Sequence, residues 1–290
     1  MSIDLIIQAE DIASADLRAL HTMAAANGIE RLEQVSHQAF RLAGADASTA
    51  SRAAVKARCD AAQLDFAFVA SGRSLTDIGL LAMDMDSTLI TIECIDEIAD
   101  FVGKKNEVAA VTASAMRGEI DWAESLRQRV ALLAGLEESA LQRVYDERLA
   151  LSPGAETLIY AAKKSGVKTL LVSGGFTFFT ERLKARLNLD FAFSNTLEIV
   201  DGKLTGRVTG SLCDAAAKAQ HVRETAAMLG LQQKQIIVIG DGANDLQMMR
   251  EAGLSVAFRA KPVVQAEASL AINHVGLDGV LPLFEKYRKL

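Results

Sequence analysis

Short apolar runs alternate with helical patterns from residue 78 onward, and this alternation constrains the fold more than any other feature of the chain. The runs are typical of strands and lie at residues 80–83, 167–173, 191–194, 235–240 and 254–258. Strands that alternate with helices in this way form a parallel sheet with helices on both faces. We therefore predict a Rossmann-like α/β fold for residues 75–290.

Two segments interrupt the alternation. Residues 92–150 are almost wholly helical in composition and stand between the first and second predicted strands. A crossover between parallel strands needs only about a dozen residues, so this segment is predicted to form a small helical cap. Residues 195–210 alternate around the pair Asp201-Gly202 and predict a small β-hairpin.

The first 74 residues follow a different pattern. Strands are expected at 3–8, 29–37, 39–44 and 64–70, and helices at 13–26 and 48–61. The order β-α-β-β-α-β is typical of a small ferredoxin-like α+β domain. The polar stretch at 71–77 is predicted to link this module, residues 1–74, to the main domain at 75–290.

The composition excludes several classes of protein. Half of the 290 residues are hydrophobic, which is enough to bury a substantial core, but no apolar stretch approaches the roughly 18 residues of a membrane span. The N-terminus carries acidic residues where a secretory signal carries basic ones, so a cytoplasmic location is expected. The net charge of −6 and the absence of a basic run argue against nucleic-acid and membrane partners. The cysteines are spaced for neither a disulfide framework nor a zinc site and are predicted to be buried thiols: Cys59, Cys94 and Cys213.

Polar residues and glycines gather at the ends of the predicted strands. In open α/β sheets, ligands bind outside the carboxyl ends of the strands. The residues at these ends are Asp84, Asp86, Ser173, Gly174, Gly175 and Asp241. Lys218 lies early in the helix that precedes the last of these strands. The sequence therefore predicts a single site at this edge of the sheet.

This set of side chains is suited to phosphoryl transfer. Asp84 and Asp241 offer the hard oxygen ligands that Mg²⁺ takes, and the ion would hold Asp84 ionised as a nucleophile beside a phosphate. Asp86 could donate a proton to the leaving oxygen and later accept one from water. Ser173 and nearby N–H groups would bind phosphoryl oxygens, while Lys218 supplies a cation. Each residue alone could also belong to a turn, a helix cap or a solvated surface. These simpler explanations do not account for all of the residues occurring together at the strand ends of one sheet.

The segments DMDST, SGG and GDGANDL, together with the helix lysine, resemble the four motifs of the haloacid dehalogenase (HAD) superfamily of aspartyl phosphatases. The resemblance is closest to its phosphoserine phosphatases and covers residues 78–285. It implies an aspartyl-phosphate intermediate on Asp84, with Asp86 as acid and base. It also implies Mg²⁺ held by Asp84, the backbone carbonyl of Asp86, and Asp241. Asn244 and Asp245 would lie around these ligands. Asn244 would face the substrate, and Asp245 would also position Lys218.

The predicted cap contains residues suited to an amino-acid substrate. Glu93 lies nine residues after Asp84 and could bind an ammonium group, and Arg129 could fork onto a carboxylate. In phosphoserine phosphatases a Glu and an Arg at matching positions bind the substrate's amino and carboxyl groups. Met116 and Trp122 resemble residues of the apolar pocket wall in that family. The resemblance therefore implies Mg²⁺-dependent hydrolysis of O-phospho-L-serine to L-serine and phosphate, in L-serine biosynthesis.

Alternatives stay open at this point. Glu93 also fits an ordinary acid at a helix N-terminus, and Arg129 also fits a surface pair with Glu124 or Asp121. A phosphotransferase to another hydroxy amino acid and an amino-acid-sensing protein with an inert catalytic domain are alternative functions. The N-terminal module resembles the ACT-like modules that precede some phosphoserine phosphatases, for which amino-acid sensing and homodimer contacts are both open. The histidines match no catalytic position of the family: His21, His37, His221 and His274.

Overall fold

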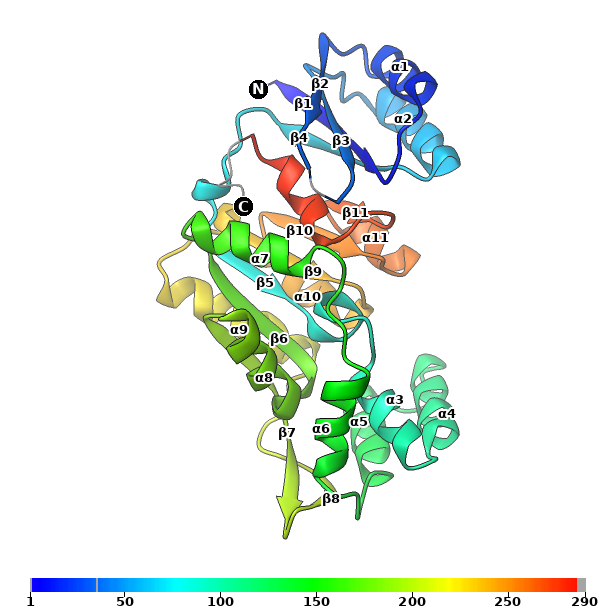
Figure 1. Cartoon of the computed structure of the whole chain (residues 1–290), viewed down its shortest axis with the longest axis vertical. Coiled ribbons are helices and arrows are strands. Elements are labelled where there is room, and N and C mark those ends of the chain that lie inside the picture. Colours follow the sequence, from blue (N-terminus) through cyan, green and yellow to red (C-terminus); the bar gives the residue numbers. More distant parts are fainter. Residues whose placement is uncertain (1, 35, 286–290) are drawn as a thin grey trace.

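The structure, a computed structural model, describes residues 2–34 and 36–285, and its strands form two sheets (Figure 1). The larger sheet has the strand order β11-β10-β9-β5-β6-β7-β8 and is parallel except for the pair β7 and β8. Its strands are β5 (Leu80–Met83), β6 (Lys168–Phe176), β7 (Phe191–Val200), β8 (Lys203–Thr209), β9 (Ile236–Gly240), β10 (Leu254–Phe258) and β11 (Leu270–Ile272). The predicted Rossmann-like sheet is confirmed.

Helices cover both faces of this sheet: α7 (Ala155–Lys164), α8 (Thr177–Leu187), α9 (Ala215–Met228), α10 (Leu246–Met249) and α11 (Pro262–Glu267). Successive residues of the central strand β5 enter two different hydrophobic cores, Leu81 and Met83 on one side, Leu80 and Ala82 on the other. Because both faces are buried, the strands are continuous apolar runs and do not alternate with polar residues. Among the residues described, none of the helices has both the length and the apolar character that a membrane span requires.

The predicted helical cap is confirmed as α3 (Cys94–Phe101), α4 (Lys105–Met116), α5 (Trp122–Ala131) and α6 (Ser139–Glu147). The two segments that connect the cap to the sheet are hydrogen-bonded to each other. The Thr91 N–H donates to the carbonyl of Ala150, and the Ser152 N–H donates to that of Leu89, each at 3.0 Å. The chain therefore enters and leaves the cap through two adjacent, hydrogen-bonded segments.

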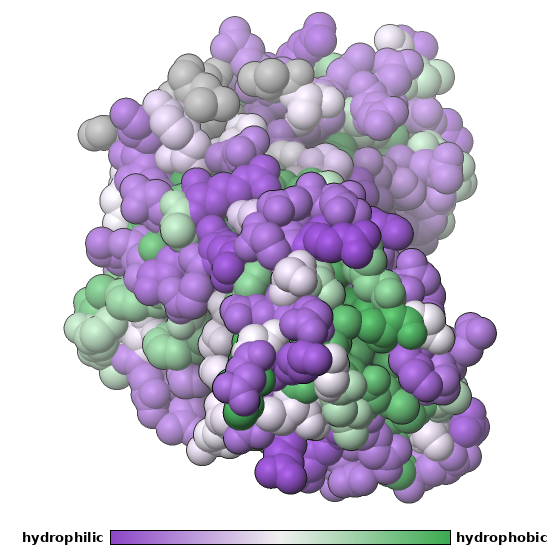
Figure 2. All heavy atoms as spheres, turned by 60° about the horizontal axis from the view of Figure 1, so that its bottom comes forward, coloured by the Kyte–Doolittle hydropathy of each residue, from purple (hydrophilic) through white to green (hydrophobic). Residues whose placement is uncertain are grey.

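The predicted β-hairpin is confirmed, and it contacts the cap. Asp201 and Gly202 at its tip have φ of 50° and 75°, the positive values that a two-residue hairpin turn requires. In β8, the Leu204 carbonyl accepts from the Gly135 N–H and the Leu204 N–H donates to the Leu136 carbonyl, both at 2.8 Å. Seen from this end, the surface is mainly hydrophilic, with apolar side chains exposed in smaller areas (Figure 2).

In the main domain, two strand predictions are wrong in extent and one strand was missed. The strand predicted at 167–173 continues to Phe176 as β6, with a register shift between Val172 and Phe176. The strand predicted at 191–194 continues through the hairpin as β7, because its outer half pairs with β8 once it has left β6. The short edge strand β11 was not predicted, since its three residues are too few to produce a pattern.

The N-terminal module contains β1 (Ile3–Ala9), α1 (Ser14–Met23), β2 (Gly28–Leu32), β3 (Gln38–Ala43), α2 (Thr49–Ala62) and β4 (Asp65–Ala70). Its sheet is antiparallel with the order β2-β3-β1-β4, so the predicted β-α-β-β-α-β pattern is confirmed. The strand predicted at 29–37 is too long, because β2 ends at Leu32, although residue 35 lies outside the described residues.

This module packs against the C-terminal part of the main domain (Figure 1). The Asp65 carboxylate accepts from three successive N–H groups, those of residues 273–275, at 2.7, 2.8 and 2.9 Å. Gln8 Nε2 donates to the Gly279 carbonyl at 2.8 Å. Ile6 and Val69 belong to the same hydrophobic core as the central strand β5. The two sheets are thus joined by both buried hydrogen bonds and apolar packing.

Candidate active site

The chain leaves β5 through one wide turn that carries two carboxylates. Residues Met85–Leu89 form one wide turn, closed by the Ile90 N–H donating to the Met85 carbonyl at 3.0 Å. The backbone of Asp86 and Ser87 inside it is not helical, and the φ of Ser87 is 55°. Here the turn directs Asp84, just before it, and Asp86, inside it, into the same pocket.

A buried lysine connects two of the strand-end carboxylates. Lys218 Nζ lies 2.8 Å from Asp84 Oδ1 and 2.9 Å from Asp245 Oδ1, and the lysine side chain is only 1% exposed. Burial disfavours the ammonium, but the charges of Asp245 and Asp84 outweigh it, so the pKa of Lys218 is raised. The simpler interpretation of Lys218 as a solvated side chain is therefore wrong.

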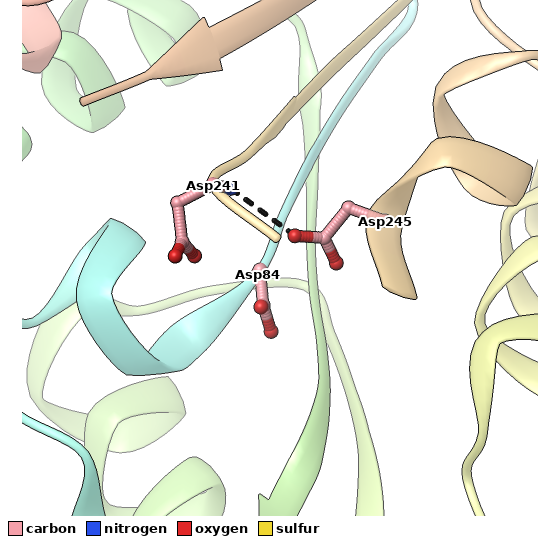
Figure 3. A group of neighbouring side chains, drawn as sticks. All are labelled: Asp84, Asp241 and Asp245. Atoms are coloured by element: carbon pink, nitrogen blue, oxygen red, sulfur yellow. Dashed lines mark hydrogen bonds between the residues drawn. The ribbon is translucent and has the colours of Figure 1, made fainter. Parts of the chain in front are cut away.

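Three carboxylates lie close together (Figure 3), and two of them contact this lysine. Oxygens of Asp84, Asp241 and Asp245 lie within 4.8 Å of one another. Asp245 Oδ2 accepts the backbone N–H groups of Asp241 at 3.1 Å and Gly242 at 3.0 Å, while its Oδ1 faces the lysine. Because both oxygens of Asp245 are already bonded, Asp84 and Asp241 are the better placed of the three to bind a cation.

The crowding of acids changes their titration. Burial, followed by the charge of Asp245, raises the pKa of Asp84 well above its usual value, although Lys218 opposes the change. The same two causes raise the pKa of Asp241 to about 6. Burial and the charge of Glu93 raise the pKa of Asp86 to about 7. Like charges held together in a low dielectric produce such shifts, and a bound cation would reverse them.

Asp86 and Ser173 face each other across the pocket. Asp86 Oδ1 accepts the Cys94 N–H at 2.9 Å, and Ser173 Oγ lies 3.5 Å from Asp86 Oδ2. Ser173 Oγ also accepts the Gly175 N–H at 2.8 Å. A Cβ at Gly175 would lie 2.7 Å from Asp86 Oδ2, so a larger residue there would displace the Asp86 carboxylate.

The strand ends and the cap enclose a pocket of about 440 Å³. It brings together these sequence-predicted residues: Asp84, Asp86, Glu93, Met116, Trp122, Arg129, Ser173, Gly174, Lys218, Asp241 and Asn244. Asp245 is fully buried behind the pocket and reaches it through Lys218. The pocket therefore combines an acidic floor, a buried cation and a wall supplied by the cap.

Arg129 does not form the surface ion pair with Glu124 or Asp121 that the sequence left open. Its Nε donates to the Ser125 carbonyl at 3.3 Å, and within the described part of the chain it has no ion pair with Glu124 or Asp121. Glu124 instead lies 3.9 Å from Arg127, and Asp121 caps α5 by accepting the Glu124 N–H at 2.7 Å. Burial lowers the pKa of Arg129. Its guanidinium is thus available to a ligand in the pocket.

The other cap residues lie at the mouth of the pocket. Glu93 precedes α3 but does not cap it with its side chain; instead it accepts a hydrogen bond from Ser87 Oγ at 2.7 Å. Met116 is 72% exposed at the end of α4. Trp122 lies against Gly174, where an added Cβ would meet its ring at 3.0 Å. The cap thus contacts the strand end directly through Trp122.

Three residues of the site were not singled out in the sequence. Thr88 Oγ1 donates to Asp241 Oδ1 at 3.1 Å, Cys94 holds Asp86 through its N–H, and Lys261 lines the pocket. Thr88 belongs to the quoted run DMDST, and Lys261 follows the carboxyl end of β10, so both positions offered a signal. Cys94 acts through its backbone, for which side-chain identity gives no signal.

The profile of the haloacid dehalogenase-like hydrolases matches residues 81–250. The chain belongs to this family. This haloacid dehalogenase-like hydrolase is 56% identical over 216 residues to the phosphoserine phosphatase of Albidiferax ferrireducens, covering 73% of this chain and 91% of the relative. A profile of a domain of unknown function matches residues 5–55.

Two solved structures are similar to this haloacid dehalogenase-like hydrolase. A probable phosphoserine phosphatase from Vibrio cholerae, in unliganded form, has a TM-score of 0.83 at 38% identity and covers 97% of this chain and 85% of its own. A phospho-aspartyl intermediate analogue of phosphoserine phosphatase has a TM-score of 0.67 at 38% identity, covering 72% of this chain and 99% of its own. The first of these likenesses extends over the N-terminal module as well.

Proposed function

We propose that this hydrolase is a Mg²⁺-dependent phosphoserine phosphatase, which converts O-phospho-L-serine to L-serine and phosphate in L-serine biosynthesis. One observation carries the proposal: a single pocket holds groups for both halves of this substrate. Asp84, Asp86 and Lys218 are arranged for a phosphoryl group, while Glu93 and Arg129 from the cap lie across from them. The name of the Albidiferax relative supports the same substrate.

The donor set fits a magnesium ion. Asp84 and Asp241 would hold it together with the backbone carbonyl of Asp86, since hard oxygen ligands from two strand ends suit this ion. When bound, the ion neutralises carboxylate and phosphoryl charge that would otherwise repel each other. Thr88 holds the side chain of Asp241 by a hydrogen bond, and Asp245 accepts the backbone N–H of Asp241.

In the first step, an Asp84 oxygen forms a bond to phosphorus as the bond from phosphorus to the seryl oxygen breaks. The electron pair of that bond stays on the seryl oxygen, which takes a proton from Asp86. Asp84 Oδ1 contacts Lys218 Nζ and accepts the Met85 N–H at 2.7 Å. Within the described residues, Asp84 Oδ2 accepts no hydrogen bond. Oδ2 is accordingly the oxygen that we assign to the attack.

In the second step, water attacks the phosphorus of the aspartyl phosphate. Asp86, now a carboxylate, accepts a proton from this water, and the bond to Asp84 breaks to release phosphate. Ser173 Oγ and nearby backbone N–H groups bind the phosphoryl oxygens, and Lys218 balances their charge. The Cys94 N–H holds Asp86 in position during both steps.

Substrate selection is assigned to the cap. Glu93 would bind the ammonium group and Arg129 the carboxylate of phosphoserine, with Met116 and Trp122 as the apolar wall and Asn244 facing the substrate. Because Glu93, Met116, Trp122 and Arg129 belong to the cap, they would couple recognition of the amino acid to closure over the phosphoryl group.

Phosphate release from a panel of phosphomonoesters, with and without Mg²⁺, tests the proposal. Phosphoserine should be turned over at the highest kcat/KM, with activity lost on chelation and restored by Mg²⁺. Equal turnover of an aryl phosphate would refute the assigned substrate. Phosphorylated homoserine formed in the presence of added homoserine would indicate a phosphotransferase. No phosphate from any ester would indicate a sensing protein with an inert catalytic domain.

The remaining parts of the proposal concern the whole chain. We assign residues 1–74 to an ACT-like module and 75–290 to the phosphatase domain, because each range contains one of the two sheets. A cytoplasmic location and a homodimer formed through the module belong to the same proposal. Sedimentation of the full chain, with and without L-serine, tests both dimer formation and amino-acid sensing.

A further inference from the structure

A buried asparagine outside the recognised motifs bridges two segments of the site. Asn195 lies in β7 and is 1% exposed. Its Nδ2 donates to the Gly174 carbonyl at 2.8 Å, and its Oδ1 accepts the Cys213 N–H at 2.8 Å. Both polar atoms of the amide are therefore used, each on the backbone of a different segment.

The first of these segments is the end of β6. Between Val172 and Phe176 the strand loses its regular register with β7, and Phe176 then pairs with Asn195. The irregular stretch presents Ser173 to the pocket. The Asn195 amide donates a hydrogen bond to the Gly174 carbonyl, and this bond restrains the irregular stretch.

The second segment leads into the helix of the buried lysine. Asp214, next to Cys213, caps α9 by accepting the Ala217 N–H at 2.8 Å. Lys218 follows in the first turns and reaches Asp84 at 2.8 Å. The position of the Cys213 backbone therefore influences where this helix begins and where the ammonium lies.

We propose that Asn195 is a positioning residue for catalysis, which aligns the phosphoryl-binding end of β6 with the helix that carries Lys218. An amide is suited to this because it offers one donor and one acceptor on neighbouring atoms. An ionised aspartate at this position could accept from Cys213 but could not donate to Gly174. The inference rests on the phosphatase chemistry proposed above but not on the identity of the amino-acid substrate.

A matched control exists at the other end of β6, next to the start of β7. Thr169 in β6 is fully buried, and its Oγ1 donates to Asp190 Oδ2 at 2.9 Å and accepts the Asp190 N–H at 3.0 Å. Like Asn195, it bridges by one donated and one accepted hydrogen bond, but it lies at the end of the strands away from the pocket. Thr169→Val therefore measures how much the loss of a bridging side chain lowers the stability of the protein, without a change in the alignment of the catalytic groups.

The experiment compares Asn195→Ala, Asn195→Asp and Thr169→Val in the full chain with Mg²⁺. We expect kcat of Asn195→Ala to fall by about 10- to 100-fold, the scale of a misplacement of about 1 Å in a catalytic group. The loss should be the same factor for phosphoserine and for an aryl phosphate, and inhibition by inorganic phosphate should weaken. Asn195→Asp should lose at least about 10-fold. Thr169→Val should keep kcat within about twofold despite a similar fall in melting temperature.

Three results would overturn the inference. The first is that Asn195→Asp has the kcat of the wild type. The second is that Thr169→Val and Asn195→Ala lose kcat equally. The third is that Asn195→Ala loses kcat for phosphoserine but not for the aryl phosphate. If Asn195→Ala does not fold, the comparison of Asn195→Asp with Thr169→Val decides the matter. A wild-type enzyme that hydrolyses only the aryl phosphate would refute the proposed substrate but leave this test intact.

Discussion

Charge balance at single residues favours the binding of a cation in this site. One ammonium, that of Lys218, is shared between Asp84 and Asp245. Asp86 and Asp241 add two further acids whose pKa values burial raises to about 7 and about 6. The pocket is therefore acidic before an anionic substrate enters, and a phosphate ester would be repelled without a further positive charge.

Asp84→Asn should abolish turnover while the protein stays folded. An amide is not a nucleophile toward phosphorus, so we expect phosphate release to fall by about 10³-fold or more. Lys218 keeps its contact with Asp245, and one crowded carboxylate is removed, so the melting temperature should not fall. Phosphate release and thermal unfolding measure the two effects. Near-normal turnover in this variant would contradict the assignment of the nucleophile.

Arg129→Ala should separate substrate recognition from chemistry. Loss of a charged hydrogen bond costs about 1.5–3 kcal/mol, so kcat/KM for phosphoserine should fall by about 10- to 100-fold. An aryl phosphate has no carboxylate to lose, and its kcat/KM should change by less than about threefold. Arg127→Ala is the control, because Arg127 lies on the same helix, does not line the active-site pocket, and within the described residues forms its ion pair with Glu124 at the surface. Equal losses on both substrates would indicate that Arg129 has a structural role.

Among the elements, the contact between the hairpin and the cap depends on one glycine. Gly206 in β8 has φ of 82°, and a Cβ there would lie 2.9 Å from Ala134 Cβ and 3.2 Å from Ala131 Cα. The hairpin backbone therefore approaches the cap more closely than a side chain at this position allows. Gly210 has a similar φ of 76°, but an added Cβ would have no atom within 4 Å.

Gly206→Ala should accordingly destabilise the protein more than Gly210→Ala does. Both variants force alanine into a left-handed conformation, but only the first adds overpacking, which typically costs about 1–3 kcal/mol. We expect the free energies of unfolding in urea to differ by about 1 kcal/mol or more. Equal values would show that the hairpin can move away from the cap without cost.

At the scale of the whole molecule, the N-terminal module and the main domain meet at a buried histidine. His37 Nε2 lies 3.1 Å from Gln8 Oε1, and its Nδ1 lies 2.8 Å from Ser36 Oγ and 3.9 Å from Asp278 Oδ2. Burial lowers the pKa of His37 and outweighs the opposing charges of Asp278 and Asp65. The folded protein therefore favours neutral His37.

This histidine should make the contact sensitive to acid. Below the unfolded pKa of about 6.5 the unfolded chain binds a proton that folded His37 resists, so stability is lost as the pH falls. Between pH 7.5 and 5.5 we expect the melting temperature of the wild type to fall relative to that of His37→Gln, because glutamine does not titrate. Thermal unfolding of both proteins at the two pH values measures this difference. The same change in both proteins would place the sensitivity elsewhere.

The predictions from sequence succeeded where the signal is local. Each apolar run marked a strand, and Asp84 and Asp241 directly follow the strands β5 and β9, as expected. Ser173 was expected at a strand end but lies inside β6, although it lines the same pocket. The predictions failed where the outcome depends on a distant partner. The continuation of β7 depends on β8, and the irregular end of β6 depends on its pairing with β7.

The sequence by itself determined the chemistry of this protein, because residue types at strand ends are properties of single positions and short motifs. Only the tertiary structure decided how these groups meet. Lys218 lies far along the chain from Asp84, and its ammonium reaches that carboxylate only because packing of α9 on the sheet buries it there. Likewise, Asn195 acquires its partners from strand register and helix placement, which arise when distant segments exclude water together and satisfy each other's hydrogen bonds.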